Sequence, residues 1–443
     1  MSNPVRAAIV GTGNRAQLFT EGLAQRDAYQ VVALCDPNPV RMAFHNRMLV
    51  SAGRPAATTW PATRYDEMLR AERVELVVVT SVDATHDTYI EAALRAGVRV
   101  ISEKPMTTDA VKAQRILDTV RETGGELSVA YNYRFNPVHR RVRELLAEGA
   151  IGLVHSVHFE WLLDVSHGAD YFRRWHRDKA NSGGLMVHKA SHHFDLVNWW
   201  LGAEPQVVYG QGQLAFYGPA GSHGYARDYE RVHGAAEALD DPFALHLADN
   251  ATLRELYLDA EGEDGYLRDR NVFAPGVSIE DDMALLVGYD TGASMSYHLT
   301  AYSPAEGYRV MFNGDRGRLE LEVEESTWTM PRQRVESSRG ALHGDLAAPT
   351  AGRTSITLRP LWAPPVDHTV DHDHAGHGGA DARVLAALLD QDPMHRADVA
   401  DARQAALALV TGLAANQSFA TGQPVRTADV LDTGMRTAVA ARE

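Results

Sequence analysis

Hydrophobic residues in the first 130 positions follow two alternating patterns. Short runs rich in β-branched residues recur, and segments whose apolar residues lie three or four positions apart separate them. Continuous apolar strands that alternate with amphipathic helices indicate a parallel sheet covered on both faces. Right-handed crossovers then predict a doubly wound Rossmann domain over residues 1–132, with its ligand at the carboxyl ends of the strands. The runs are RAAIVG at 6–11, VVALCD at 31–36, ELVVVTS at 75–81, RVIS at 99–102 and LSVAYN at 127–132.

From about residue 150 onward, polar and apolar residues alternate instead. LVHSVHFEWLL at 153–163 and GRLELEVEE at 317–325 have the period of two that is typical of antiparallel strands with one solvated face. MVHKASHHFDLVNWWLG at 186–202 interrupts these strands as a helix that ends at a glycine. The pattern predicts an α+β domain over residues 133–443, with a mostly antiparallel open sheet and helices on one side.

Three stretches of this second domain stand apart. Residues 217–275 contain many Gly, Asp and His with little periodicity, which indicates an insertion lying over or beside the site. Residues 335–380 are rich in Gly, Pro and His and are expected to form a long loop. Residues 381–420 have the alanine and leucine spacing of helices.

Composition narrows the class of protein. The chain has 443 residues, enough for two domains, and a formal net charge of −15, which argues against sequence-independent nucleic-acid binding. Its apolar runs are too short to span a bilayer, and no basic amino-terminal region precedes an apolar stretch. The single cysteine, Cys35, excludes an internal disulfide framework and is expected to be a buried apolar residue. We expect a cytoplasmic enzyme that acts on small molecules, with no nucleic-acid or membrane partner.

A glycine-rich motif directly follows the first predicted strand. Gly11, Gly13 and Ala16 form a G-x-G-x-x-A pattern that opens a helix, whose amino terminus would supply N–H donors to a pyrophosphate. Asp36 follows Ala16 by twenty residues at the end of the second strand, where its carboxylate would accept bonds from an adenosine ribose. Together these residues predict an NAD site, which also includes Asn14 and Arg15 of the loop. Asp36 would repel the 2′-phosphate of NADP, whereas the nearby Arg41 leaves that choice open.

Lys104 ends the fifth predicted strand and is followed by Pro105. Because strand carboxyl ends face the cofactor in this architecture, its ammonium could bond a substrate hydroxyl and stabilise an alkoxide. Alternatively, the lysine extends to solvent and the proline only ends the strand. The residues alone leave both interpretations open.

A second group of titratable residues lies on the helix predicted near residue 190. His188, His192 and Asp195 are spaced i, i+4 and i+7, which places them on one helical face, and Lys189 and His193 occupy the adjacent stripe. Two imidazoles and a carboxylate aligned in this way suit proton transfer. The spacing also suits metal ligands, but there is no H-E-x-x-H motif and we expect no metal.

Two other polar segments each allow two interpretations. DYFRRWHRDKANSGG at 170–184 gathers basic residues, among them Arg174 and His176, which could bind an anionic substrate group or form an ordinary solvated loop. DHTVDHDHAGHGGAD at 367–381 contains His368, His372, His374 and His377, for which a hydrated loop is favoured over a metal site.

These motifs together resemble the Gfo/Idh/MocA family, which includes glucose–fructose oxidoreductase and inositol dehydrogenase. The resemblance covers nearly the whole chain, and its most specific element is Glu103-Lys104-Pro105. It also runs through IVGTGNRA, ELVVVTSVDATHDTYIEAALRAGVRVISEKPMTTD, YNYRFNPVHRRVRELLAEGAIG, SGGLMVHKASHHFDLVNWWLG and DARQAALALVTGLAANQSFATGQPV.

The resemblance implies roles for particular residues. Lys104 would contact the substrate hydroxyl, Glu103 and Lys104 would lie at the cofactor, and Pro105 would help to shape the nicotinamide pocket. The family helix pattern D-x-G-x-H-x-x-D is matched by His192, its usual acid/base, and by Asp195; His188 and Ala190 replace its first Asp and its glycine. A standard triad therefore cannot be assumed. The resemblance also places Tyr133 and Arg134 on the substrate side and His86 near the cofactor, and it implies a homodimer or homotetramer joined through the open sheet.

The expected activity is an NAD-dependent dehydrogenase that removes hydride from a ring carbinol, at C3, of a sugar, polyol or glycoside. Lys104, His192 and His188 would be catalytic, and Tyr133, Arg134, Lys189, Asp195, Arg174 and His176 would bind substrate. An alternative is a redox-neutral NAD-dependent glycosidase that oxidises, eliminates, adds water and reduces again; the basic segment would suit an anionic sugar, as in sulfoquinovosidases. A non-enzymatic NAD sensor is disfavoured by the presence of Lys104 and His192.

Overall fold

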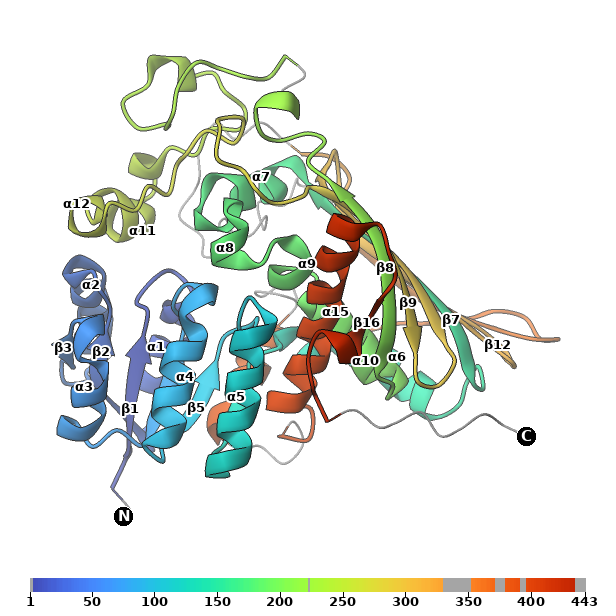
Figure 1. Cartoon of the computed structure of the whole chain (residues 1–443), viewed down its shortest axis with the longest axis horizontal. Coiled ribbons are helices and arrows are strands. Elements are labelled where there is room, and N and C mark those ends of the chain that lie inside the picture. The colour runs from blue at the N-terminus through green and yellow to red at the C-terminus, as the bar shows by residue number, and fades with distance from the viewer. Residues whose placement is uncertain (1–2, 222–223, 330–351, 371–378, 391–395, 435–443) are drawn as a thin grey trace.

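A computed structural model describes residues 3–221, 224–329, 352–370, 379–390 and 396–434. The chain forms two sheets, and helix α15 (Ala402–Thr421) lies between them (Figure 1). The fold class is the one that the sequence predicts, a parallel Rossmann sheet followed by a mostly antiparallel sheet.

The first sheet has seven strands in the order β15-β6-β5-β4-β1-β2-β3. All its pairs are parallel except β15 with β6. The strands are fully apolar at the centre because helices cover both faces; every residue of β4 is buried. The strands are β1 Val5–Val10, β2 Tyr29–Cys35, β3 Thr58–Trp60, β4 Leu76–Val79, β5 Arg99–Ser102, β6 Leu127–Val129 and β15 Ala400–Asp401; the helices are α1 Ala16–Ala24, α2 Pro39–Ser51, α3 Tyr65–Ala71, α4 His86–Arg95 and α5 Ala110–Thr123.

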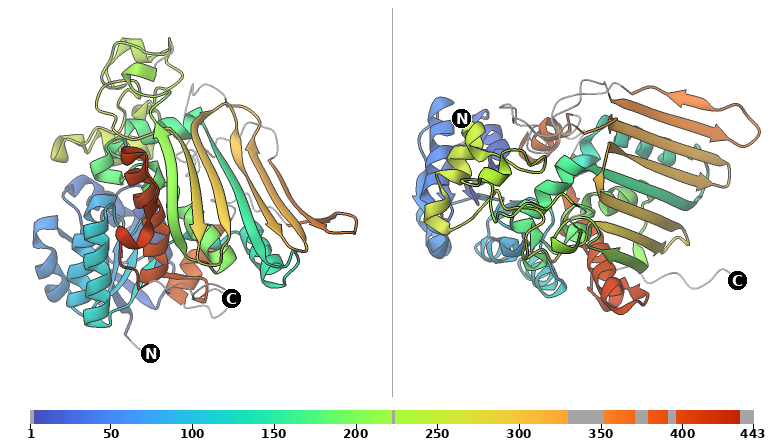
Figure 2. Two further views of the ribbon diagram at one scale, coloured as in Figure 1. Left: turned by 45° about the vertical axis from the view of Figure 1, so that its right-hand side comes forward. Right: turned by 90° about the horizontal axis from the view of Figure 1, so that it is seen from above.

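The second sheet has nine strands in the order β14-β13-β12-β11-β7-β10-β9-β8-β16, with a parallel pair only between β10 and β7. Its strands alternate buried and more exposed residues, because helices pack on one face (Figure 2). The strands are β7 Val154–Asp164, β8 Pro205–Gln213, β9 Asp282–Tyr289, β10 Ser294–Ser303, β11 Glu306–Gly314, β12 Gly317–Ser326, β13 Arg353–Pro360, β14 Val366–His368 and β16 Val425–Arg426; the helices are α6 Pro137–Ala147, α7 Val165–Arg173, α8 Lys179–Ser182, α9 Leu185–His188 and α10 Ser191–Leu201.

The carboxyl-terminal region returns to the first domain. Helix α13 (Ala380–Leu385) and the π-helical turn Ala386–Asp390 join the apolar cluster around α1, and β15 extends the Rossmann sheet. A Cβ on Gly22 of α1 would lie 2.8 Å from Leu385, so α1 packs closely against α13. The predicted helical stretch 381–420 is therefore interrupted, with one part on each domain.

The insertion at 217–275 consists of short helical turns joined by loops, and Figure 1 shows its helices α11 and α12 above α2. Its turns are η5 Pro219–Gly221, η6 Ala236–Ala238, η7 Leu247–Asp249, α11 Ala251–Leu253, the π-turn η8 Arg254–Leu258 and α12 Glu261–Asp264. Arg177 holds its end by donating to the carbonyl oxygens of Asn271, Ala274, Pro275 and Gly276. Within the described parts of the chain, no helix has the length and apolar character needed to cross a membrane.

Candidate active site

The glycine-rich loop has the geometry that the motif predicts. Gly11 has φ +82°, and a Cβ there would lie 2.4 Å from the Cα of Ser81, so only glycine fits. Gly13 meets only the hydroxyl of Tyr257, at 3.8 Å from an added Cβ. Ala16 is fully buried and begins α1, whose first N–H groups point toward the loop.

Asp36 closes the other side of this loop. Its carboxylate accepts from the backbone N–H of Thr12 at 2.6 Å and of Asn38 at 2.8 Å. Burial raises the pKa of Asp36, and the two N–H bonds and the Arg41 guanidinium oppose that rise. A buried carboxylate at the end of β2, beside a loop that only glycine can form, fits the adenosine side of NAD. Gly11, Gly13, Asn14, Ala16 and Asp36 would hold that cofactor.

Arg15 joins the glycine-rich loop to the Glu-Lys-Pro motif. Its Nε donates to Glu103 at 2.6 Å, and its guanidinium also pairs with Asp381 of the returning helix. The carboxylate of Glu103 also accepts from the backbone N–H of Lys104 at 3.2 Å. Arg15 and Glu103 are both expected at the cofactor. Their contact with each other positions the glycine-rich loop against Lys104.

His86 holds the same turn from behind. It is fully buried, with Nδ1 2.9 Å from the carbonyl oxygen of Pro105 and Nε2 3.1 Å from that of Ser81. Burial lowers the pKa of His86, so the ring is neutral and donates to one carbonyl at a time. The Lys104–Pro105 peptide bond is cis. His86 therefore positions the Pro105 turn.

Lys104 extends from the end of β5 toward the second domain. Its Nζ donates to the carbonyl oxygen of His188 at 3.1 Å and lies 3.5 Å from His188 Nε2. Burial lowers the pKa of Lys104 to about 8, although the carboxylates of Asp83 and Glu103 oppose that change. The interpretation in which Lys104 extends freely to solvent does not hold, because its ammonium is bound at the interface of the two domains.

Asp83, which was not among the predicted site residues, supplies a carboxylate to His188. It lies at η2 (Asp83–Thr85), between β4 and α4, and its Oδ2 is 2.5 Å from His188 Nδ1. Burial raises the pKa of Asp83 and lowers that of His188, which the Lys104 ammonium lowers further. We assign the proton to Nδ1, because Nε2 then accepts from Lys104. His188 stands where the family pattern has its first Asp, and a carboxylate of the other domain bonds to it.

The predicted continuous helix is divided between His188 and Ser191. Helix α9 ends at His188 and α10 begins at Ser191, with the Ala190 N–H bonded to the Leu185 carbonyl across a wider turn. The wider turn changes the i, i+4 alignment of His188 and His192. His188 contacts Lys104 and Asp83, whereas His192 packs on Tyr133.

His192 lies in an aromatic wall. Its ring stacks on Tyr133 with centroids 4.3 Å apart and meets the edge of Tyr131 at 5.6 Å. The Tyr133 hydroxyl accepts from Lys189 Nζ at 3.0 Å, and that ammonium also lies 4.9 Å from the centroid of Trp161. Lys189 is 5% exposed, so an aromatic surface accommodates a buried positive charge beside the predicted acid/base.

Arg134 and Asp195, expected to bind substrate, instead bind each other. The guanidinium donates in bidentate fashion, Nε to Oδ2 at 2.7 Å and Nη2 to Oδ1 at 2.6 Å, and both side chains are buried. Arg134 also donates to Gln404 and to the Asp398 carbonyl oxygen. The pair joins α10 to α15 and to the segment that leaves the Rossmann sheet, which gives both residues a structural role; their contact with substrate stays a prediction.

Arg174 and His176 lie beside the Lys104–His188 pair. His176 is 3% exposed, stacks on Trp175 and meets the His188 ring with centroids 4.2 Å apart. Arg174 pairs with Asp170 at 3.1 Å; burial lowers the pKa of both His176 and His188, and the Arg174 charge lowers both further. Asp170 also pairs with Arg173 and with Arg268 of the insertion, so this region gathers more positive than negative charge.

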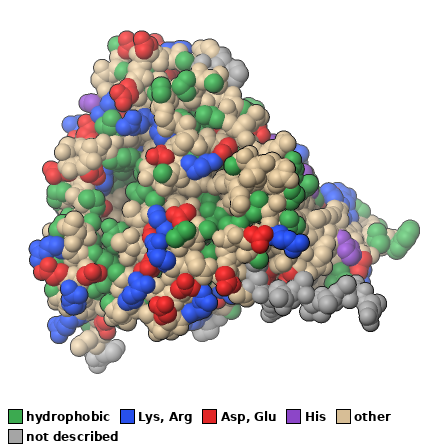
Figure 3. Space-filling model, in the orientation of Figure 1, with side chains coloured by type: hydrophobic (Ala, Val, Ile, Leu, Met, Phe, Trp, Pro, Cys, Tyr) green, Lys and Arg blue, Asp and Glu red, His purple; other side chains and the backbone are tan. Residues whose placement is uncertain are grey.

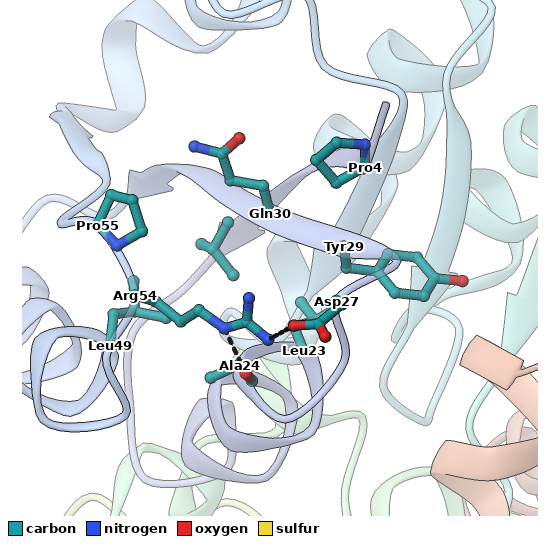
Figure 4. A pocket seen from close by; sticks show the side chains of 10 residues that line it. Pro4, Leu23, Ala24, Asp27, Tyr29, Gln30, Leu49, Arg54 and Pro55 are labelled. Carbon is teal, nitrogen blue, oxygen red and sulfur yellow. Dashed lines mark hydrogen bonds and ion pairs between the residues drawn. The ribbon is translucent and has the colours of Figure 1, made fainter. Parts of the chain in front are cut away.

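The remaining predicted features lie apart from this site. Cys35 is fully buried, and burial raises the pKa of its thiol to about 12, as expected of an apolar core residue. Of the His-rich segment, His368 ends β14, and His372, His374 and His377 lie outside the described residues. The described residues contain no cluster of three potential metal ligands. A pocket beside β2, drawn in Figure 4, contains none of the predicted site residues; its lining includes Pro4, Leu23, Tyr29, Leu49 and Arg54.

The fold and the Gly11–Asp36 geometry define an NAD-binding Rossmann enzyme. The model for the oxidoreductase family's NAD-binding Rossmann fold matches residues 5–131, and the model for its C-terminal alpha/beta domain matches 143–427. The chain belongs to the Gfo/Idh/MocA oxidoreductase family and is an NAD-dependent oxidoreductase.

Particular relatives agree with that assignment. The oxidoreductase YteT of Bacillus subtilis (strain 168) is 32% identical over 440 residues, covering 94% of this chain and 96% of its own. Inositol 2-dehydrogenase of Rhizobium meliloti (strain 1021) is 28% identical over 204 residues, covering 46% and 57%. The WlbA dehydrogenase of Bordetella pertussis, solved with NADH and UDP-GlcNAcA, shares the fold with a TM-score of 0.60 and 17% identity over 96% of this chain and 98% of its own.

Proposed function

We propose that the protein is an NAD-dependent dehydrogenase that oxidises a ring carbinol, at C3, of a sugar or glycoside. The observation that carries the proposal is the bound Lys104 ammonium, which lies 3.5 Å from a neutral, carboxylate-bonded imidazole at the carboxyl end of the Rossmann strands. The family's inositol 2-dehydrogenase relatives support a polyhydroxylated substrate.

The proposed roles follow from the contacts. The Lys104 ammonium would donate to the oxygen of the reacting hydroxyl and stabilise negative charge as the carbonyl forms. His192, held by Tyr133, would accept the hydroxyl proton. Asp83 would hold the His188 ring so that its Nε2 orients the ammonium. When bound, NAD supplies the acceptor for the hydride.

A second candidate is a redox-neutral NAD-dependent glycosidase. It is favoured by the replacement of the helix carboxylate by His188, because elimination and water addition require an acid/base besides the one used for oxidation. His188 and His192 occupy separate environments, one bonded to Asp83 and the other stacked on Tyr133, so they could act in different steps.

We also propose that the substrate carries an anionic group near Arg174. Arg174 and Arg268 share the carboxylate of Asp170, at 3.1 and 2.7 Å, and Arg173 pairs with it as well. Guanidinium groups bind carboxylates and sulfonates in bidentate fashion, and an anionic sugar would reduce the excess of positive charge. A sugar acid is therefore a better first substrate than its neutral parent.

One assay distinguishes these candidates. Purified protein is incubated with NAD and matched free sugars, sugar acids and aryl glycosides, and NADH and released aglycone are followed together. Stoichiometric NADH from a free sugar or sugar acid supports the dehydrogenase; aglycone release without net NADH, lost when NAD is removed, supports the glycosidase. The control variant is Lys112→Gln on α5, which carries the same change of charge as Lys104→Gln at a lysine that bonds Ala84.

The assembly stays a prediction. We propose a homodimer or homotetramer joined through the face of the nine-stranded sheet that lies away from α15, and size-exclusion chromatography with light scattering tests it. On the face shown in Figure 3, acidic and basic side chains are interspersed. The cytoplasmic location and the lack of a nucleic-acid partner were inferred from sequence and stay predictions.

A further inference from the structure

Residues 254–266 of the insertion, which we name the clasp, bind the Rossmann domain through three hydrogen bonds that involve backbone groups and through two ion pairs. The backbone N–H of Asn14 donates to the Tyr257 hydroxyl at 3.0 Å. The Asn38 amide donates to the Ala260 carbonyl oxygen at 2.8 Å, and Arg41 Nε donates to the Leu256 carbonyl oxygen at 3.0 Å. The three partners are the phosphate loop, the N-cap of α2 and the first turn of α2. The clasp therefore covers the adenosine side of the dinucleotide site.

The clasp also holds the Arg41 guanidinium in one position. The guanidinium donates to Asp264 at 2.7 Å and lies 5.7 and 5.6 Å from the ring centroids of Tyr257 and Tyr266. Arg41 is 8% exposed, and a second nitrogen of its guanidinium also donates to Asp264, at 3.4 Å, so the pair is bidentate. Arg47 on the same helix pairs with Glu255 of the clasp.

Arg41 is the basic residue that follows Asp36 and could otherwise accept a 2′-phosphate. To contact such a phosphate the Arg41 guanidinium would have to break both of its hydrogen bonds to Asp264, and the Asp264 carboxylate would then lie beside a second anion. Asp36 already disfavours the phosphate from the end of β2. The clasp thus adds a second barrier to NADP, one that substitution of Asp36 alone would leave in place.

Tyr257 acts at the phosphate end. Its hydroxyl accepts from the Asn14 N–H and retains its own proton, which can be donated to an anionic oxygen at the helix amino terminus. The ring is held on one side by Arg41 and on another by Arg268, whose guanidinium lies 5.7 Å from the ring centroid and pairs with Asp170. The hydroxyl is thus positioned over the loop before any ligand arrives.

We propose that the clasp completes the cofactor site. Tyr257 binds the pyrophosphate and slows NAD release. Asp264 holds Arg41 in an ion pair, so that Arg41 cannot bind a 2′-phosphate and NADP is rejected. Nothing in the family motif assigns a cofactor role to this insertion. The proposal depends on NAD binding and not on which sugar is oxidised, so a failure of the proposed dehydrogenase activity would leave it unaffected.

The selectivity test uses direct binding. Dissociation constants for NAD and NADP are measured by calorimetry for wild type, Asp36→Ser, Asp264→Asn and the double variant. We expect Asp36→Ser alone to gain little NADP affinity, and the double variant to bind NADP at least about tenfold more tightly than Asp36→Ser does. Equal NADP affinity in Asp36→Ser and the double variant would overturn the role of Asp264. Asp259→Asn, at a half-exposed clasp residue paired with Arg254, is the matched control.

The retention test uses Tyr257→Phe, which keeps the ring and removes only the hydroxyl. Stopped-flow displacement of bound NAD should show release about tenfold faster than in wild type, the effect of losing about one hydrogen bond to a charged group. Thermal unfolding of the NAD-free variant should be close to that of wild type, which separates loss of the contact from loss of the fold. Unchanged release from a folded Tyr257→Phe variant would overturn the role of Tyr257.

Discussion

Replacing Asp83 by asparagine removes a charge that supports the Lys104 ammonium while preserving the size of the side chain. The Asp83 carboxylate lies 2.5 Å from His188 Nδ1, and the Lys104 ammonium lies 3.5 Å from His188 Nε2. With the width of the imidazole ring added, the carboxylate and the ammonium are about 8 Å apart. A unit charge at about 8 Å contributes about 2 kcal/mol at an effective dielectric constant of about 20. That free energy corresponds to a fall of about 1.5 in the pKa of Lys104.

The assay is the pH dependence of kcat/KM. Because the ammonium must be protonated to donate to the reacting oxygen, activity should fall as pH rises through the Lys104 pKa of about 8. Asp83→Asn lowers that pKa, so its falling limb should move to a more acidic pH by about 1.5. The control Asp87→Asn removes a buried carboxylate that pairs with Arg115 instead, and it should leave the limb in place. A falling limb that stays with wild type, or moves to higher pH, would refute the electrostatic link.

Four further outcomes are expected. His192→Asn should lower kcat by about 10²- to 10⁴-fold while calorimetry shows NAD binding unchanged, because the lost group acts on the proton. Asp195→Asn should lower the free energy of unfolding by about 3–5 kcal/mol in urea titration, because it leaves the buried Arg134 without its ion-pair partner. Gly11→Ala should abolish measurable NAD binding, because its Cβ would lie 2.4 Å from Ser81 Cα. Cys35 should react with a thiol reagent only as fast as the protein unfolds, because the thiol is buried and its pKa is about 12.

Local patterns predicted the parts of the site that depend on short stretches of chain. The G-x-G-x-x-A loop requires glycine at position 11 because the backbone there has positive φ and touches Ser81, and such a constraint is visible in sequence. The placement of Lys104 at the end of β5 followed equally from strand order. The sequence shows both its motif and its partner helix, although it does not show the contact between Lys104 and His188.

Pairings between distant segments could not be predicted in the same way. Asp83 lies in the segment 75–109 that resembles the family, but nothing local shows that its carboxylate meets His188 across the domain interface. The pairing of Arg134 with Asp195 cannot be predicted for the same reason, because the two residues lie 61 positions apart in different elements. Two features of the sequence point to Asp83. The helix pattern has no acid at position 188. An acid, Asp83, lies between the end of a strand and the next helix, on the side of the sheet that faces the site.

The division of the helix near Lys189 was missed because its periodicity continues across the break. The residues from Leu185 to Trp200 remain apolar at helical spacing, whereas the break consists of a wider turn at Ala190. Likewise the alanine-rich stretch after residue 380 predicted helices correctly, but its return to α1 depends on the fit of Leu385 against Gly22.

The claim that Lys104 and His192 act on a carbinol is tested most directly by deuterium transfer in a single turnover. Protein loaded with NAD is mixed with sugars, sugar acids and glycosides deuterated at one ring carbon at a time, quenched, and the cofactor is analysed by mass spectrometry. We predict deuterium in the reduced nicotinamide from the C3-labelled substrate with wild type, and its loss with Lys104→Gln but not with Lys112→Gln. Absence of deuterium from every ring position, with NAD shown to be bound, would contradict the assignment.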